Sequence, residues 1–171
     1  MLIPGQKTPA LELPLTIEAR FALADQSPDN FTMLVFYRGK HCPICKKSLE
    51  ELATKLDDFS KAGVNVFSVS MENEDRAMAI DSDWATGDVP LAYDLSEDQA
   101  REWGLYISEG REGTEEPAKF SEPAVFLIRP DGTLYSAHVQ SVPFARPQFD
   151  DLLEAVKFVT EKDYPARGTL T

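Results

Sequence analysis

The two cysteines of the chain lie three residues apart, between an apolar run and a segment of helical spacing. The apolar run 33–37 (Met-Leu-Val-Phe-Tyr) is typical of a buried central strand. After the cysteines, apolar residues recur at helical intervals with charged residues between them, at Leu49, Leu52, Leu56 and Phe59. Cys42 and Cys45 are therefore predicted at the N-terminal end of a helix that follows a central strand, one turn apart on the same side.

This position favours a reactive thiol. Unpaired amide N–H groups and the positive end of the helix dipole lower the pKa of a cysteine at a helix start. The stretch from Arg38 to Ser48 adds four cations and no acid, in a chain whose net charge is −12. Cysteines at positions i and i+3 can close a disulfide with little backbone movement, so we interpret the pair as a dithiol that cycles with its disulfide.

Length and charge limit the remaining classes of function. A chain of 171 residues is most simply a single domain, residues 1–171, with a core of its own. Its 29 acidic against 17 basic residues argue against nucleic-acid binding. No apolar run approaches the ~20 residues needed to span a bilayer, and residues 1–7 do not resemble a signal peptide. We expect no membrane association, and we expect the cytoplasm, a reducing compartment that suits a working dithiol.

The rest of the chain alternates strand and helix patterns. Short edge strands are expected within 10–15 and 20–23, a second central strand at 64–70 and a short strand at 91–93. Residues 124–128 and 133–139 are expected to form an antiparallel hairpin, and helices are expected at 74–84, 96–103 and 147–162. Pro147 is expected at the first position of the last helix, and residues 105–121 are expected to be a polar loop insertion. This order predicts the α/β class, with a central mixed β-sheet flanked by helices on both faces.

The element order with Cys-x-x-Cys after the first central strand resembles the thioredoxin fold, over roughly residues 10–162. Phe36-Tyr37-x-x-x-x-Cys42-Pro43-Ile44-Cys45 is similar to the active-site segment of peroxiredoxins, Phe-Tyr-Pro-x-x-x-Thr-x-x-Cys. On that alignment Cys45 stands at the peroxidatic cysteine, Cys42 at the threonine and Arg38 at the proline. The resemblance therefore implies a peroxiredoxin-like relative whose threonine is replaced by a second cysteine.

The run from Pro123 to Gly132 (Pro-Ala-Val-Phe-Leu-Ile-Arg-Pro-Asp-Gly) also resembles peroxiredoxins, which have arginine where this chain has Pro123. In thioredoxins a cis-proline faces the cysteine pair, and Pro123 is similar in place. The acid that thioredoxins bury six residues before the first cysteine is Phe36 here. The best overall resemblance is to the peroxiredoxin-like (alkyl hydroperoxide reductase/thiol-specific antioxidant) branch, carrying a thioredoxin-type CxxC.

The resemblance implies a thiol–disulfide oxidoreductase, or antioxidant, that works through Cys42 and Cys45 without a metal or organic cofactor. By analogy with thioredoxin, Cys42 attacks and Cys45 resolves the mixed disulfide. By analogy with peroxiredoxins, Cys45 is the peroxidatic cysteine of a thiol-dependent peroxidase and Cys42 resolves its sulfenic acid. A redox-sensing interaction module with little turnover is the alternative that is not an enzyme.

The expected partners are disulfide-bearing proteins or peroxide, together with an external thiol reductant, and the oligomeric state stays open, a dimer included. Arg38, His41, Pro43 and Pro123 are the expected supporting site residues. Arg38 and His41 can each stabilise a thiolate, and each can equally be a solvated charge or an exposed ring. A structural disulfide or half of a zinc site would also explain a lone cysteine pair.

Overall fold

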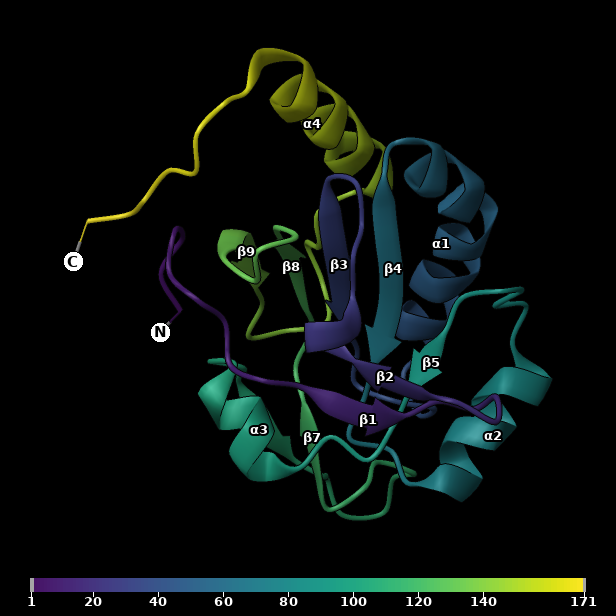
Figure 1. Ribbon diagram of the computed structural model, residues 1–171. Coiled ribbons are helices and arrows are strands. Elements are labelled where there is room, and N and C mark those ends of the chain that lie inside the picture. The colour runs from purple at the N-terminus through teal and green to yellow at the C-terminus, as the bar shows by residue number, and fades with distance from the viewer. Residues whose placement is uncertain (1, 171) are drawn as a thin grey trace.

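The computed structural model describes residues 2–170, and its centre is a five-stranded sheet in the order β5-β4-β3-β8-β9 (Figure 1). The strands are β3 (Phe31–Phe36), β4 (Val64–Val69), β5 (Leu91–Ala92), β8 (Ala124–Ile128) and β9 (Leu134–Val139). β3, β4 and β5 run parallel, whereas β8 is antiparallel to β3 and β9 is antiparallel to β8. The predicted mixed sheet is confirmed.

β3 is buried on both faces, which explains its unbroken apolar sequence. Because side chains alternate along a strand, Met33 and Val35 belong to one hydrophobic core, and Leu34 and Phe36 belong to a second core on the opposite face. The sheet therefore separates two cores. Tyr37, which follows β3, and both cysteines belong to the first core.

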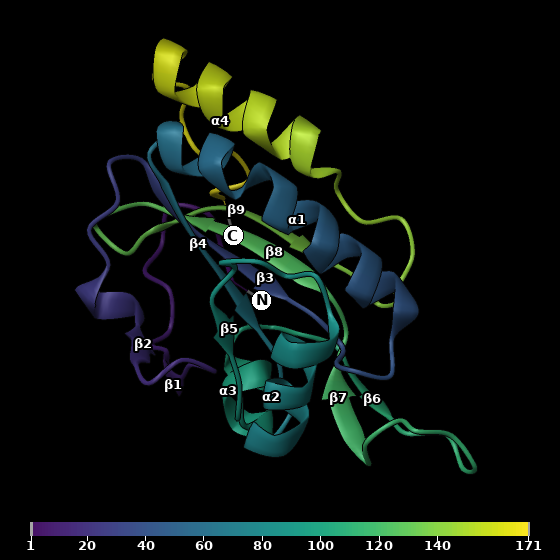
Figure 2. The ribbon, with the colours of Figure 1, turned by 90° about the vertical axis from the view of Figure 1, so that its right-hand side faces the viewer.

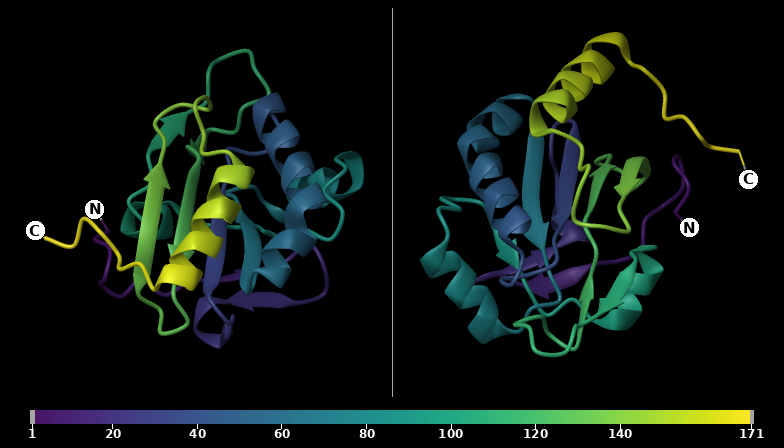
Figure 3. Two further views of the ribbon diagram at one scale, coloured as in Figure 1. Left: turned by 90° about the horizontal axis from the view of Figure 1, so that it is seen from above. Right: turned by 180° about the vertical axis from the view of Figure 1, so that it is seen from behind.

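Helices cover both faces, as predicted. α1 (Pro43–Lys61) and α4 (Phe149–Lys162) pack against each other on the face of the first core, and they lie side by side in Figures 2 and 3. α3 (Glu97–Glu102) covers the second core, together with the strands β1 (Glu12–Pro14) and β2 (Arg20–Ala22). The remaining helices are α2 (Glu74–Asp83), whose Ile80 reaches the first core, and the short 3-10 helix Leu23–Asp25.

Capping residues in the sequence predict most of the helix ends correctly. α1 ends at Lys61, before Gly63 with φ of +72°, and α3 begins with the predicted capping box of Ser96 and Gln99. The predicted first position of α4 is wrong, because Gln148 is its N-cap and Pro147 therefore precedes the helix. Within the described residues, none of these helices is both long and apolar enough to cross a bilayer.

Two segments differ from their expected form. β1 and β2 pair only with each other among the named strands, as a separate two-stranded sheet rather than as edges of the central one. Residues 105–121 contain an antiparallel hairpin of β6 (Ile107–Glu109) and β7 (Lys119–Ser121), which projects from one end of the molecule in Figure 2. The polar residues that were expected to form a loop lie at the tip of this hairpin. Its two strands have only three residues each, which is too short for an alternating apolar pattern to be recognised in the sequence.

Candidate functional site

The cysteine pair lies where the chain leaves β3 and enters α1, as predicted. Cys42 is the N-cap of α1, and its Sγ accepts a hydrogen bond from the Cys45 backbone N–H at 3.3 Å. Pro43 follows at the first helical position, where a residue without an N–H costs no hydrogen bond. The N-cap geometry therefore gives the Cys42 sulfur the place that an Asp or Ser oxygen takes in other helices.

Arg146, which is distant from the pair in the sequence, contacts both sulfur atoms. This residue lies in the segment between β9 and α4, and its Nη2 is 3.2 Å from Cys45 Sγ and 4.0 Å from Cys42 Sγ. Its Nε–H donates to the Pro143 carbonyl at 2.9 Å, which holds the guanidinium in its own segment. Both cysteines are buried free thiols, with 1% and 0% of their surface exposed. Access of a large partner to the sulfur atoms therefore requires movement of the surrounding chain.

The two thiols differ in acidity. Hydrogen bonds from the Cys45 thiol and backbone N–H, with the nearby Arg38 and Arg146, outweigh burial and lower the pKa of Cys42 to about 5. Burial, and the proton that Cys45 shares with the Cys42 thiolate, raise the pKa of Cys45 well above its ordinary value. At neutral pH the site therefore pairs a Cys42 thiolate with a Cys45 thiol.

Arg38 connects the thiolate to two buried acids. Its Nη1 is 4.0 Å from Cys42 Sγ, its Nε is 3.3 Å from a carboxylate oxygen of Glu122, and its Nη2 is 3.6 Å from Glu116. The guanidinium also lies over the Phe120 ring, 4.6 Å from its centroid. Glu116, Phe120 and Glu122 come from the β6–β7 hairpin and the residue after it, so this segment forms one wall of the site.

His41 packs beside this cluster. Its ring lies 4.7 Å from that of Phe120, and neither ring nitrogen has a hydrogen-bond partner among residues 2–170. Burial, together with the charge of Arg38, lowers the pKa of His41, so the ring is neutral at physiological pH. A neutral imidazole supplies no positive charge to the thiolate.

Glu72 fixes the loop that leads into Cys42. Its carboxylate is 3% exposed, accepts the Lys40 backbone N–H at 2.7 Å, and pairs with Arg76 Nε at 2.5 Å. Gly39 adopts φ of +133°, and a Cβ at this glycine would lie 2.1 Å from the Glu72 carboxylate. Only glycine fits here, so the loop geometry depends on this close approach.

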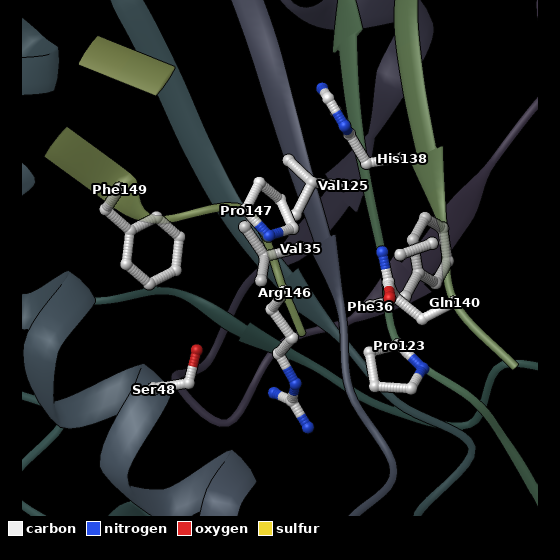
Figure 4. A pocket seen from close by; sticks show the side chains of 11 residues that line it. Val35, Phe36, Ser48, Pro123, Val125, His138, Gln140, Arg146, Pro147 and Phe149 are labelled. Atoms are coloured by element: carbon white, nitrogen blue, oxygen red, sulfur yellow. The ribbon is translucent and has the colours of Figure 1, made fainter. Parts of the chain in front are cut away.

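Pro123 immediately precedes β8 and lines a small hollow together with Arg146. Figure 4 shows the Arg146 side chain directed away from His138, between Ser48 and Pro123. The implied cis-proline is wrong, because none of the peptide bonds in the described part of the chain is cis. Pro123 thus lines the site with a trans peptide bond, unlike the cis-proline of thioredoxins.

In the described region, no cluster of three or more His, Cys, Asp or Glu side chains is arranged to hold an ion. The sequence pattern missed Arg146, Glu72, Glu116 and Glu122. Arg146 carries no motif and stands 101 residues after Cys45, and the peroxiredoxin alignment directs attention to Pro123 instead. The acids lie in segments without a clear period, so only the folded chain reveals their partners.

The AhpC/TSA family model matches residues 4–137. The chain belongs to the AhpC/TSA family. Two curated proteins of Mycobacterium tuberculosis, from strains CDC 1551 and H37Rv and both named as peroxiredoxins, are 30% identical to it over 105 residues. That alignment covers 61% of this chain and 66% of each relative, so slightly less than two thirds of the relatives' length is matched.

Solved structures agree on the fold. Peroxiredoxin 6 of Arenicola marina superposes with a TM-score of 0.80 at 18% identity, covering 95% of this chain and 76% of that one. AhpC of Enterococcus faecalis gives 0.76 at 20% identity, with coverage of 96% and 98%. BcpB of Mycobacterium tuberculosis gives 0.73 at 17% identity, with coverage of 93% and 99%. The chain therefore has the thioredoxin-like fold of peroxiredoxins.

Proposed function

We propose that this AhpC/TSA protein is a thiol-dependent peroxidase in which Cys42 attacks the peroxide and Cys45 resolves the product. The observation that carries the proposal is the position of Cys42 at the N-cap of α1, where its Sγ accepts the Cys45 backbone N–H at 3.3 Å and lies 4.0 Å from both Arg38 and Arg146. These contacts lower the pKa of Cys42 to about 5, whereas burial raises the pKa of Cys45. The thiolate is the nucleophile in thiol chemistry, so Cys42 holds the reactive form at neutral pH.

The reaction proceeds in two steps. The Cys42 thiolate attacks one oxygen of a hydroperoxide ROOH, the O–O bond breaks, and ROH leaves after taking up one proton. The resulting Cys42 sulfenic acid condenses with the Cys45 thiol, which forms the disulfide and releases water. Two electrons have then passed from the dithiol to the peroxide, and an external thiol reductant returns them.

Burial supports a peroxide as the substrate. Cys42 and Cys45 are only 1% and 0% exposed, so a protein disulfide could reach their sulfurs only after a large movement of the surrounding chain, whereas hydrogen peroxide and small hydroperoxides need a much smaller opening. The arginines on both sides of the pair, Arg38 and Arg146, supply donors that stabilise the negative charge on the leaving oxygen. The working unit in this proposal is a single domain, residues 1–171, acting in a reducing compartment such as the cytoplasm.

A thiol–disulfide oxidoreductase for protein substrates is the second candidate. It is favoured by the position of Cys42 at the N-cap of α1 within Cys-Pro-Ile-Cys. This activity requires the segment around Arg146 to move, because that segment helps to bury both sulfurs.

Single-turnover reaction of the reduced protein with hydrogen peroxide tests the proposal. We expect Cys42→Ser to lose the fast phase by about 100-fold or more, since the remaining thiol is almost fully protonated at neutral pH. We expect Cys45→Ser to react and to stop at a sulfenic acid on Cys42, detected by mass spectrometry after trapping with dimedone.

The outcomes separate the alternatives. Peroxide consumption that survives Cys42→Ser but not Cys45→Ser would make Cys45 the peroxidatic residue and overturn the order of attack. Insulin reduction without peroxide consumption would establish the disulfide reductase instead. Reversible oxidation without turnover in either assay would indicate a redox sensor.

A further inference from the structure

Reduction of the disulfide, the second half of the proposed cycle, requires a binding site for the reductant, and a hollow lies beside Arg146. This hollow, about 190 Å³, lies between the first turns of α1 and the segment that joins β9 to α4. Its lining combines apolar and charged side chains, chiefly Ile44, Phe144, Lys47, Glu51 and Arg146. Arg146 contacts Cys45 Sγ and also lines this hollow, so its guanidinium lies between the hollow and the sulfur pair.

Arg146 differs from Arg38 in its counter-ions. Arg38 is paired with the carboxylates of Glu116 and Glu122. Arg146 forms no ion pair with a carboxylate among residues 2–170, and its recorded partners are the Pro143 carbonyl and the two sulfurs. The Cys42 thiolate is therefore the anion that Arg146 faces in the reduced protein. A disulfide carries no charge, so oxidation leaves the guanidinium without an anion.

We propose that this hollow binds the reductant of the oxidised protein, a small thiol that carries a carboxylate, with Arg146 as the residue that recognises the anion. Lys47 adds a second positive charge and Glu51 a single negative one, so the hollow retains an excess of positive charge. Ile44 and Phe144, the latter 61% exposed, provide apolar surface for the carbon skeleton of the thiol. This inference rests on the proposed function, whose disulfide product it consumes.

The acidity of the pair selects the sulfur that is attacked. In thiol–disulfide exchange the thiol of lower pKa leaves faster, and Cys42 has the lower pKa of the two. Attack on Cys45 requires the segment around Arg146 to move, because Cys45 is 0% exposed. The thiolate of the reductant, RS⁻, then attacks Cys45 Sγ from the hollow, a mixed disulfide RS–SγCys45 forms, and Cys42 departs as a thiolate. A second RS⁻ attacks the sulfur of the bound reductant, RSSR leaves, and the Cys45 sulfur takes up one proton. Two electrons have passed from two small thiols to the protein.

The test starts from protein oxidised with diamide, so it does not depend on any reaction with peroxide. Reduction rates are measured with mercaptoacetate, mercaptoethanol and aminoethanethiol, which are anionic, neutral and cationic. Each rate is expressed per thiolate and divided by the rate of the same thiol with bis(2-hydroxyethyl) disulfide, because the intrinsic nucleophilicity of a thiolate rises with its pKa. We expect mercaptoacetate to react about tenfold faster than aminoethanethiol. Arg146→Gln should bring this ratio close to one, and Lys47→Gln should lower it by less.

The matched control is Arg20→Gln, which removes the same charge from an exposed position on β2 and should leave the ratio unchanged. If Arg146 acted only through the Cys42 pKa or through packing, Arg146→Gln would slow all three thiols by the same factor, and the proposal would be overturned. A protein dithiol such as thioredoxin that reduces the pair faster than mercaptoacetate per thiolate would overturn it as well.

Rapid acid quench and alkylation locate the mixed disulfide by mass spectrometry. The proposal requires mercaptoacetate on Cys45 and an alkylated Cys42, whereas the reverse assignment rejects it. Peroxide single turnover is measured separately on the same preparation. A failure there, with charge-selective reduction intact, would reject the peroxidase and leave the reductant site standing.

Discussion

Two sulfurs one helical turn apart differ in acidity because their neighbours differ. Cys42 receives the hydrogen bonds of the helix start, whereas Cys45 is fully enclosed and keeps its proton. The sequence predicts the position of this pair at the start of a helix, and that position is confirmed, whereas the redox role of the pair stays a prediction. It does not predict Arg146, which lacks a motif and reaches the pair only through the fold of β9 and α4.

The acidity of Cys42 predicts a distinct pH profile for alkylation. With iodoacetamide, the rate at Cys42 should rise about tenfold per pH unit up to pH ~5 and then level off, because the thiolate predominates above its pKa. Cys45→Ala should move this midpoint upward, since the hydrogen bond from the Cys45 thiol is the largest single stabiliser of the thiolate and alanine has no donor to replace it. In Cys42→Ser, the remaining thiol should be slower than free cysteine at neutral pH. A wild-type midpoint above pH 8 would contradict the assignment.

At the scale of elements, the helix starts and strands were predictable, and the connections between them were less so. β3 is an almost unbroken apolar run, and β4 and α1 have strong apolar periods. The predicted positions of all three are confirmed within a few residues. The loop before Cys42 and the β6–β7 hairpin depend on single contacts across the fold, such as Glu72 with Lys40 and Glu122 with Arg38. Contacts of this kind leave no period in the sequence.

Gly39→Ala tests the loop that presents Cys42. The new Cβ would meet the Glu72 carboxylate and also impose strain at positive φ, so we expect a loss of about 2–4 kcal/mol in the free energy of unfolding, measured in urea. Gly113→Ala is the matched control, because that glycine has φ of +74° with no atom within 4 Å. Backbone strain alone should cost it about 1 kcal/mol. Equal losses in the two variants would show that the contact with Glu72 is unimportant.

The whole molecule consists of two cores on opposite faces of one sheet. The face with α1 and α4 contains the thiols, and the other contains an aromatic cluster in which Phe126 packs against Phe36 and Trp103, with centroids 5.6 Å and 5.2 Å away. The α/β class and the two-sided sheet follow from the order and apolar content of the strands. The separate sheet of β1 and β2 does not, since three-residue strands give too short a pattern to assign a partner.

This division predicts that stability and reactivity can be separated. Phe126→Ala should cost about 3–5 kcal/mol through the cavity that it leaves, while the alkylation midpoint of Cys42 stays at its wild-type value. Thermal or urea unfolding combined with the pH profile measures both quantities. Phe158→Ala, at a side chain 52% exposed on α4, should change the free energy of unfolding by less than about 0.5 kcal/mol. A large shift of the thiol midpoint in Phe126→Ala would show that the two faces are coupled.

The two cores also divide the intrinsic fluorophores of the protein. Trp84 belongs to the face of the thiols, with its ring 6.5 Å from that of Tyr37, whereas Trp103 is fully buried on the opposite face. Each tryptophan thus has a separate environment, and the emission of a Trp103→Phe variant comes from the thiol face alone. The fold thus places one fluorophore in the core that contains the sulfur pair and a second one in the core on the opposite face of the sheet.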